Sequence, residues 1–221
     1  DAEYRNSFIT EGIRLSYYPR MNQRKNTDLL ENKYRTYKKF KDMYKREVIR
    51  ILKNEKPTEE NLAKLREFAE RHENYVVKPV YAAFGNGVRV ENLGMYDSVE
   101  EAHQEYSKSG AVIEEVIVQG EALSKIHAGS VNTLRIPTAI IKNEEGEPEI
   151  KLFHPSIRMG RGDSFVDNFS AGGVSALIDA ETGVIYTDGA DKKGHTYECH
   201  PDSGIRFKGF QIPQWDEAVS M

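Results

Sequence analysis

Apolar residues recur at three- and four-residue spacing in the first half of the chain, which is the spacing of one helix face. The first such run covers residues 30–52, with basic residues between the apolar ones. A second helix is expected to begin after its N-cap, Thr58, and a third after Ser98, where Glu101 would complete a capping box. The third helix should stop near Gly110, because glycine tolerates the left-handed backbone that ends many helices.

Between and after these helices the period shortens to that of strands. The sequence there is rich in β-branched residues and is divided by turn residues. The pattern predicts strands within 74–80, 87–92, 111–118, 132–141, 149–158 and 172–187. Two hairpins are expected, at 140–153 and 176–187, because each joins alternating stretches through a short polar loop that contains glycine. Helices that precede and interrupt mainly antiparallel strands make an α+β fold.

Composition and charge exclude several classes of protein. With 221 residues, 38% of them hydrophobic, the chain can bury a core in one large domain or two small lobes. The formal net charge of −4 argues against a general nucleic-acid binder. No stretch approaches the roughly 18 apolar residues that a membrane span needs, and the N-terminus lacks the apolar centre of a signal peptide. Because Cys199 is the single cysteine, no intrachain disulfide can form. These features predict a soluble, cytoplasmic protein without membrane insertion.

Lys78 ends an apolar run and is followed by a glycine-flanked turn. Since the residue before a proline is pushed into extended backbone, Lys78 should lie on the strand that ends near Pro79. Gly85 and Gly87 permit a tight turn whose backbone N–H groups can approach a phosphate closely. A strand lysine beside such a turn can grip a polyphosphate. The structural alternatives are a lysine that extends to solvent and an ordinary hairpin turn.

Two acidic residues, Glu114 and Glu115, stand within the apolar strand 111–118. One interpretation is a strand edge with solvated carboxylates. The other is a hinge whose backbone and acids meet a nucleoside.

Arginine, acidic and amide residues concentrate in two later strand-like stretches. Arg135 and Arg158 each lie in an apolar run, where a guanidinium needs an anion or carbonyl groups for its fixed set of donors. Phosphate is a natural partner, and an ion pair with a carboxylate such as Asp167 is the structural alternative. Asp167, Asn168 and the glycines at 172–173 form either an ordinary turn or a loop that orients a phosphate or a metal-bound water.

Three further signals carry little weight. His195, Cys199 and His200 lack a fourth ligand at zinc-site spacing. The triplets at 161–163 (RGD) and 168–170 (NFS) match short extracellular motifs that occur often by chance.

Taken in order, seven blocks of the chain resemble the sugar-transfer-associated ATP-grasp family, whose members are linked with bacterial capsule and surface polysaccharide production. The blocks are residues 29–49, 76–88, 112–119, 130–138, 158–183, 200–204 and 209–215. The resemblance implies an ATP-grasp fold, in which two α+β lobes hold ATP between antiparallel sheets. It implies an N-terminal helical region at 1–73, a small lobe at 74–118 and a larger lobe at 119–221.

The resemblance also implies roles for particular residues. Lys78 is similar to the strand lysine that contacts ATP phosphates, under a loop formed by YAAFGNG with Gly85 and Gly87. Lys33 is similar to an earlier phosphate-facing lysine, with a solvated position on its basic helix as the alternative. Adenine would meet Glu114, Glu115, Val116 and Ile117, and Glu121 would be a ribose partner. Arg135 and Arg158 match arginines near phosphates or an acyl-phosphate, and Asp167 and Asn168 match the adjacent polar loop.

The implied reaction begins when a carboxylate attacks the γ-phosphate of ATP to form an acyl-phosphate, from which an amine or another nucleophile then displaces phosphate. The approach of two anions demands charge neutralisation by lysines, arginines and Mg²⁺. The family's magnesium-binding Asp, Glu and Asn lie beyond its IPQW block, and no metal ligand is identified here. The start also falls inside the family's N-terminal region, so the expectation is a chain truncated at both ends, with a degenerate variant as the alternative.

We thus expect an ATP- and Mg²⁺-dependent carboxylate-amine ligase that acts on a component of surface-polysaccharide synthesis. The alternatives are a nucleotide-binding or scaffolding module without catalysis, and an ATP-dependent kinase. The expected partners are ATP and a small-molecule or sugar-linked acceptor, with no nucleic acid. Self-association through exposed strand edges is a further expectation.

Overall fold

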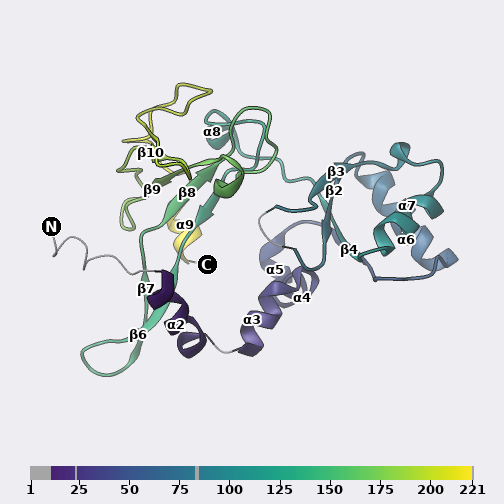
Figure 1. Ribbon diagram of the computed structural model, residues 1–221, viewed down its shortest axis with the longest axis horizontal. Coiled ribbons are helices and arrows are strands. Elements are labelled where there is room, and N and C mark those ends of the chain that lie inside the picture. Colours follow the sequence, from purple (N-terminus) through teal and green to yellow (C-terminus); the bar gives the residue numbers. More distant parts are fainter. Residues whose placement is uncertain (1–10, 23, 83–84, 221) are drawn as a thin grey trace. The chain divides into compact units, whose positions relative to one another are not determined.

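The computed structural model describes residues 11–22, 24–82 and 85–220 (Figure 1). The chain divides into two compact units, Asp1–Val116 and Ile117–Met221, called here the first and the second unit. The expected helical region 1–73 and small lobe 74–118 thus share one unit, and the division falls two residues before the expected boundary after residue 118.

The first unit is built on a four-stranded antiparallel sheet in the order β1-β4-β2-β3. The strands are β1 (Val48–Ile51), β2 (Tyr75–Pro79), β3 (Arg89–Glu91) and β4 (Ala111–Glu115). The helices are α2 (Glu11–Met21), α3 (Arg24–Glu31), α4 (Lys33–Lys39), α5 (Lys41–Tyr44), α6 (Glu59–Arg71) and α7 (Val99–Ser107), with a 3-10 turn η1 (Leu93–Met95).

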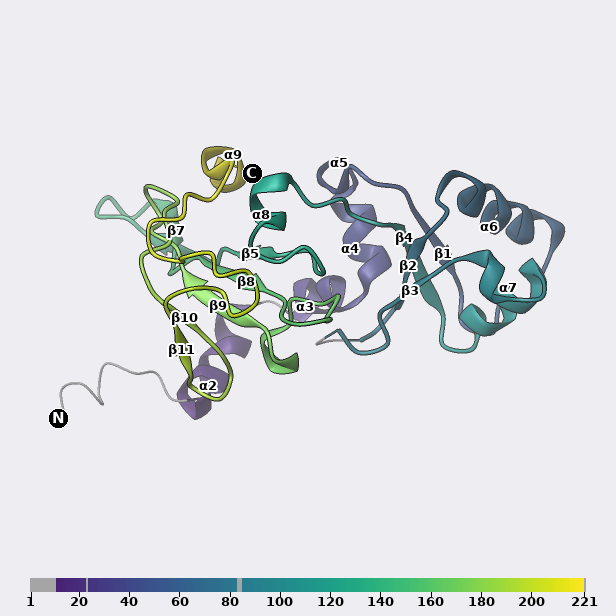
Figure 2. The same cartoon turned by 90° about the horizontal axis from the view of Figure 1, so that it is seen from above.

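Both faces of this sheet are covered (Figures 1 and 2). Helices α6 and α7 pack on one face, where Phe68 and Tyr106 join Tyr75 and Ile113 of the strands in a buried core. The tyrosines of α4 and α5 pack on the other face, against a smaller apolar group that includes Val112. Charged strand residues also lie on the face that α4 and α5 cover.

The helix expected over 30–52 is wrong at its C-terminal end, because residues 48–51 form β1. Helix α5 stops at Tyr44, and Lys45 takes a left-handed φ of 44°. The strand then pairs with β4 from Val48 opposite Glu114 to Ile51 opposite Ala111. Val and Ile favour strands, since their branched side chains are restricted in a helix. Sequence spacing alone could not reveal the distant partner strand.

The second unit contains a five-stranded antiparallel sheet in the order β11-β10-β9-β8-β5 and a separate β6–β7 hairpin. The strands are β5 (Thr133–Arg135), β6 (Thr138–Lys142), β7 (Pro148–Leu152), β8 (Ser156–Met159), β9 (Val174–Leu177), β10 (Gly189–Ala190) and β11 (Thr196–Tyr197). Short helices are α8 (Glu121–Ser124), the 3-10 turn η2 (Phe169–Ala171) and α9 (Trp215–Ser220).

Prolines divide two of the expected strands. The stretch 132–141 breaks at Pro137 into β5 and β6, and 149–158 breaks before Pro155 into β7 and β8. Proline has no N–H to donate to a sheet, so neither expected strand continues through its proline. The hairpin expected at 140–153 is confirmed, with Ile140 opposite Ile150.

The five-stranded sheet has one apolar and one polar face. Ile157, Met159 and Val174 point into a core closed by Phe207 and Trp215. The opposite face carries Thr133, Arg135, Ser156, Arg158 and Ser175, because side chains alternate along each strand. The α+β class and the mainly antiparallel pairing are confirmed. Across the described ranges, no helix has the length and apolar content that a bilayer crossing needs.

Thr58 begins α6 as expected, and its replacement tests how much this cap stabilises the first unit. The Thr58 hydroxyl accepts a hydrogen bond from the Asn61 N–H (3.3 Å), and the Asn61 side chain accepts one from the Thr58 N–H (2.7 Å). We expect Thr58→Ala to lower the free energy of unfolding by about 1 kcal/mol in urea titrations. Thr58→Ser retains the hydroxyl and should lose much less. Equal losses in the two variants would contradict this role of the hydroxyl.

Candidate functional site

A cluster of charged side chains lies on the α4–α5 face of the first sheet. Lys78 of β2 and Glu114 of β4 share this face, because Lys78 stands opposite Val112 and Glu114 opposite Val76. The Lys78 ammonium lies 2.7 Å from a Glu114 carboxylate oxygen, and the Arg46 guanidinium lies 3.0 Å from the same oxygen. Glu114 is only 3% exposed. Together with Lys33, these residues are called the Glu114 cluster.

Lys33 enters the cluster from the first turn of α4. Its backbone N–H donates to the Val80 carbonyl (3.3 Å), and its ammonium donates to the Ala82 carbonyl (2.5 Å). Burial lowers the pKa of Lys33 below its usual value, the nearby Lys78 charge lowers it further, and Glu114 opposes both. Three cations therefore lie near one carboxylate, which leaves positive charge without an acidic partner among the described residues. A partly buried excess of this kind favours an incoming anion.

The expected glycine turn closes over the end of β2. Gly85 and Gly87 have φ values of 77° and 70°, which disfavour other residues. A Cβ on Gly87 would lie 2.8 Å from the Pro79 ring, so only glycine fits against the strand that carries Lys78. Within the expected YAAFGNG loop, Ala83 and Phe84 lie outside the described residues.

The acidic residues Glu115, at the end of β4, and Glu121, in α8, make contacts in different places. Glu115 lies on the sheet face opposite to Glu114, and its carboxylate accepts a hydrogen bond from the Glu47 N–H (3.1 Å). Val116 ends the first unit and Ile117, which is 43% exposed, begins the second. Glu121 lies in α8, where it pairs with Lys125 at 2.9 Å. The structure therefore brings Lys33, Lys78 and Glu114 together, whereas Glu115 and Glu121 have other contacts.

Arg158 and Asp167 meet on the polar face of the second sheet. The Arg158 guanidinium lies 3.3 Å from the Asp167 carboxylate and donates to the Thr133 hydroxyl at 2.8 Å. Thr133 in turn donates to Asp167. The ion pair that was the structural alternative for the arginines is present for Arg158. Arg135 is exposed on the same face, and in the described ranges its side chain has no hydrogen-bond or ion-pair partner.

Asn168 shapes the loop that follows Asp167. Its side-chain oxygen accepts the Ser170 N–H at 2.7 Å and caps the turn η2, and its carbonyl accepts the Gly173 N–H at 3.1 Å. A Cβ on Gly173 would lie 2.8 Å from the carbonyl oxygens of Asp167 and Met159. The loop is thus fixed closely against β8, with the Asn168 side chain used within it.

The sequence did not predict two residues that contact these charged side chains, Arg46 and Thr133. Arg46 lies in the basic run that the helical spacing covers, and its position depends on β1, two residues later. Its guanidinium also lies 4.2 Å from the centre of the Tyr44 ring. No local pattern distinguishes Arg46 from the other basic residues of that run.

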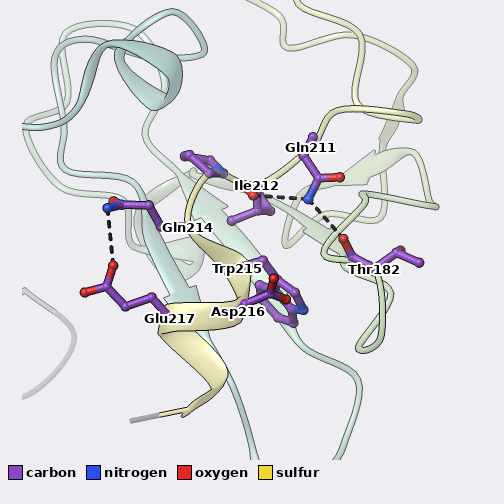
Figure 3. A pocket seen from close by; sticks show the side chains of 8 residues that line it. Thr182, Gln211, Ile212, Gln214, Trp215, Asp216 and Glu217 are labelled. Carbon is purple, nitrogen blue, oxygen red and sulfur yellow. Dashed lines mark hydrogen bonds between the residues drawn. The ribbon is translucent and has the colours of Figure 1, made fainter.

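A separate hollow of about 480 Å³ lies near α9 (Figure 3). Gln211 donates there to the carbonyls of Thr182 (3.0 Å) and Ile212 (3.2 Å). The charged residues that line this hollow are Asp216 and Glu217, with no basic one among them. Its charge has the wrong sign for a phosphate. Within the described residues, no three His, Cys, Asp or Glu side chains come together as a metal site.

Comparisons with known proteins add a family to this geometry. Residues 13–221 match the model of a family described as sugar-transfer associated ATP-grasp. No curated protein matches the chain. Among solved structures, that of D-cycloserine synthetase DcsG is similar, with 12% identity and a TM-score of 0.33. The match covers 75% of this chain and 57% of that one.

The lowered pKa of Lys33 predicts a pH dependence of stability. Since the unfolded chain binds this proton more tightly than the folded chain, the Lys33 contribution to the free energy of unfolding should rise with pH toward 10.5. Subtracting the unfolding free energy of Lys33→Met from that of the parent, at several pH values, isolates this contribution.

Lys64 provides a control of opposite sign. Its side-chain hydrogen bond and charge interaction with Glu60 raise its pKa, so its contribution should fall as the pH rises above 10.5. The unfolding free energy of the parent minus that of Lys64→Met should therefore fall with pH. If the same quantity for Lys33→Met also fell, burial and repulsion by Lys78 could not be what determines the pKa of Lys33.

The two arginines of the polar face should differ in their effect on stability. Arg158→Met deprives Asp167 and Thr133 of their partner and should lower the free energy of unfolding by about 1–3 kcal/mol. Arg135→Met should change it by less than about 0.5 kcal/mol. Urea unfolding of both variants measures the difference. A loss for Arg135→Met as large as that for Arg158→Met would show that Arg135 also has a structural role.

Proposed function

Because the match extends over residues 13–221, the chain belongs to the sugar-transfer associated ATP-grasp family, and we propose that it binds ATP for a ligase reaction. The reaction joins a carboxylate to an amine or a related nucleophile through an acyl-phosphate. Its substrate is a component of bacterial surface-polysaccharide synthesis, and the protein acts in the cytoplasm. The family description supports the link to sugar transfer, and the reaction class is our inference.

The Glu114 cluster is the observation on which the proposal mainly depends. Lys78 and Arg46 share one carboxylate oxygen, and Lys33 lies close enough to Lys78 for its pKa to fall. Glu114 neutralises one positive charge and holds the cations in position. The remaining charge suits the phosphates of ATP, which are stabilised by lysine and arginine donors. The turn at Gly85 and Gly87, packed on Pro79, is well suited to cover a phosphate.

Arg135 and Arg158 are assigned to the acyl-phosphate step. In that step a carboxylate oxygen attacks the γ-phosphorus and ADP leaves. The amine then attacks the acyl carbon, inorganic phosphate leaves and the amine loses a proton. Guanidinium groups reduce the repulsion between the two anions that must meet. Arg135 is free to contact an anion, whereas Arg158 is held by Thr133 and Asp167 and would act from a fixed position.

The described residues hold no group of three His, Cys, Asp or Glu side chains that could ligate the Mg²⁺ that the family implies. The proposal therefore assigns no residue to the metal and no step to it.

The first measurement is calorimetric titration of the chain with a nonhydrolysable ATP analogue, without and with Mg²⁺. We expect Lys78→Met to weaken binding about ten- to a hundredfold, as the loss of one charge-assisted hydrogen bond requires. Arg46 still pairs with Glu114 in this variant, so the first unit should remain folded, which circular dichroism checks. Lys64→Met, at an exposed site on α6, is the matched control and should bind as the parent does.

Two results would overturn the assignment. One is a folded parent that binds no analogue. The other is a Lys78→Met variant whose affinity equals that of Lys64→Met. Product analysis with an acceptor then tests the reaction: an amide with ADP and free phosphate supports the ligase, and a phosphorylated acceptor supports a kinase instead.

A further inference from the structure

A positively charged pocket lies in the second unit, away from the hollow of Figure 3. It has a volume of about 450 Å³ and is lined by Arg161, Lys192, Lys193, Tyr197 and the turn 170–172. We call it the Arg161 pocket. Strands β10 and β11, at one edge of the five-stranded sheet (Figure 2), frame the loop that carries the two lysines. No residue of this pocket belongs to the Glu114 cluster.

The acidic residue of the pocket, Asp191, is saturated by its own loop. Its carboxylate accepts hydrogen bonds from the N–H groups of Lys193 (2.8 Å) and His195 (3.0 Å), from the His195 ring (2.9 Å) and from the Tyr197 hydroxyl (3.0 Å). The bond from the His195 ring contributes most to holding the pKa of Asp191 far below its usual value. Asp191 is 8% exposed, so its role is to hold the loop and not to meet a ligand.

The cations of the pocket have few partners among the described residues. The Arg161 guanidinium donates to the Tyr197 hydroxyl at 3.0 Å and lies 5.2 Å from the centre of that ring. Its closest approach to Asp191 is 3.9 Å, too long for a hydrogen bond. In the part of the chain that the structure describes, Lys192 and Lys193 form no side-chain ion pair. Tyr197 thus positions one side of the guanidinium and leaves its other donors for a ligand.

The balance of charge selects the class of ligand. Arg161, Lys192 and Lys193 carry three positive charges, and Asp191 carries the one carboxylate that lines the pocket. Two positive charges are left over, which match a phosphate monoester of about −1.5 to −2 at pH 7 better than a singly charged carboxylate. We propose that the Arg161 pocket binds the phosphate group of a small molecule.

The position of the pocket gives this phosphate a role. Its rim at 170–172 overlaps the turn η2 (Phe169–Ala171), in which the Ser170 N–H donates to the side chain of Asn168, the residue directly after Asp167. A molecule held by its phosphate in the pocket therefore lies beside the loop assigned to the acyl-phosphate step. If the proposed function holds, the ligand is the phosphorylated second substrate. Phosphate binding itself does not depend on that function.

The test is a titration followed by amide chemical shifts in NMR spectra, read at residues 170–172 and 192–197. The probes are inorganic phosphate, glucose 1-phosphate and glucuronate, at constant ionic strength. Saturable shifts with inorganic phosphate are expected, and Arg161→Gln should weaken them at least fivefold. The Asp191 hydrogen bonds do not involve Arg161, so the loop should keep its structure. Lys208→Gln removes an exposed lysine of the same unit that pairs with Asp188, and should leave the affinity unchanged.

Each outcome has a definite meaning. Tighter binding of glucose 1-phosphate than of inorganic phosphate supports a phosphorylated sugar substrate, and equal binding supports recognition of the phosphate alone. Glucuronate bound as tightly as either would overturn the selection for phosphate. Chemical shifts that do not saturate with phosphate would overturn the proposal that the pocket binds phosphate. Equal phosphate affinities of the parent and Arg161→Gln would overturn it as well.

The same titration separates this proposal from nucleotide binding. Lys78→Met should retain phosphate binding in the Arg161 pocket while losing affinity for the ATP analogue. A parent that binds phosphate here but no analogue would refute only the nucleotide site. A parent that binds the analogue but shows no shifts at 170–172 and 192–197 would refute only the pocket.

Discussion

The buried carboxylate of Glu114 is the constraint on which the first unit depends. A carboxylate that is 3% exposed must be neutralised and hydrogen-bonded, because an unpaired buried charge costs several kcal/mol. Lys78 and Arg46 meet this demand from two other parts of the chain, one on β2 and one just before β1. One carboxylate oxygen of Glu114 thus connects β4 both to β2 and to the residues just before β1. Glu114 also determines where the cations of the cluster point.

This arrangement lowers stability in ways that the proposed ligand site would explain. Lys33 would be easier to accommodate if it were neutral, since both burial and Lys78 lower its pKa. The turn at Gly87 excludes any side chain through its contact with Pro79. Features that a purely structural sheet would avoid therefore gather at one end of β2. Perturbed ionisable groups and constrained glycines occur together where a site is prepared for a ligand. A structural ion-pair network alone would not need the third cation.

Local physics made parts of this structure predictable and left others out of reach. The Thr58 cap and the extended backbone at Lys78 depend on neighbouring residues, and both could be predicted from the sequence. The strand β1 could not, because its apolar residues continue the helical spacing and its identity depends on pairing with β4, more than fifty residues later. The role of Arg46 could not be predicted for the same reason, because its position depends on β1. The opposite directions of Glu114 and Glu115 follow from strand alternation, but their partners depend on tertiary contacts.

The two proposed anion sites differ in how their carboxylates are satisfied, and this difference affects how each would respond to a ligand. Glu114 is bound by the same cations that would meet a phosphate, so an incoming anion must share Lys78 with it. Asp191 is bound by N–H groups, a tyrosine and a histidine, so the lysines beside it have no competing acidic partner in the described ranges. The cations of the Glu114 cluster are therefore held in position before the ligand arrives, but Glu114 weakens their attraction for an anion. The Arg161 pocket keeps its full attraction but leaves its lysines to be ordered by the ligand.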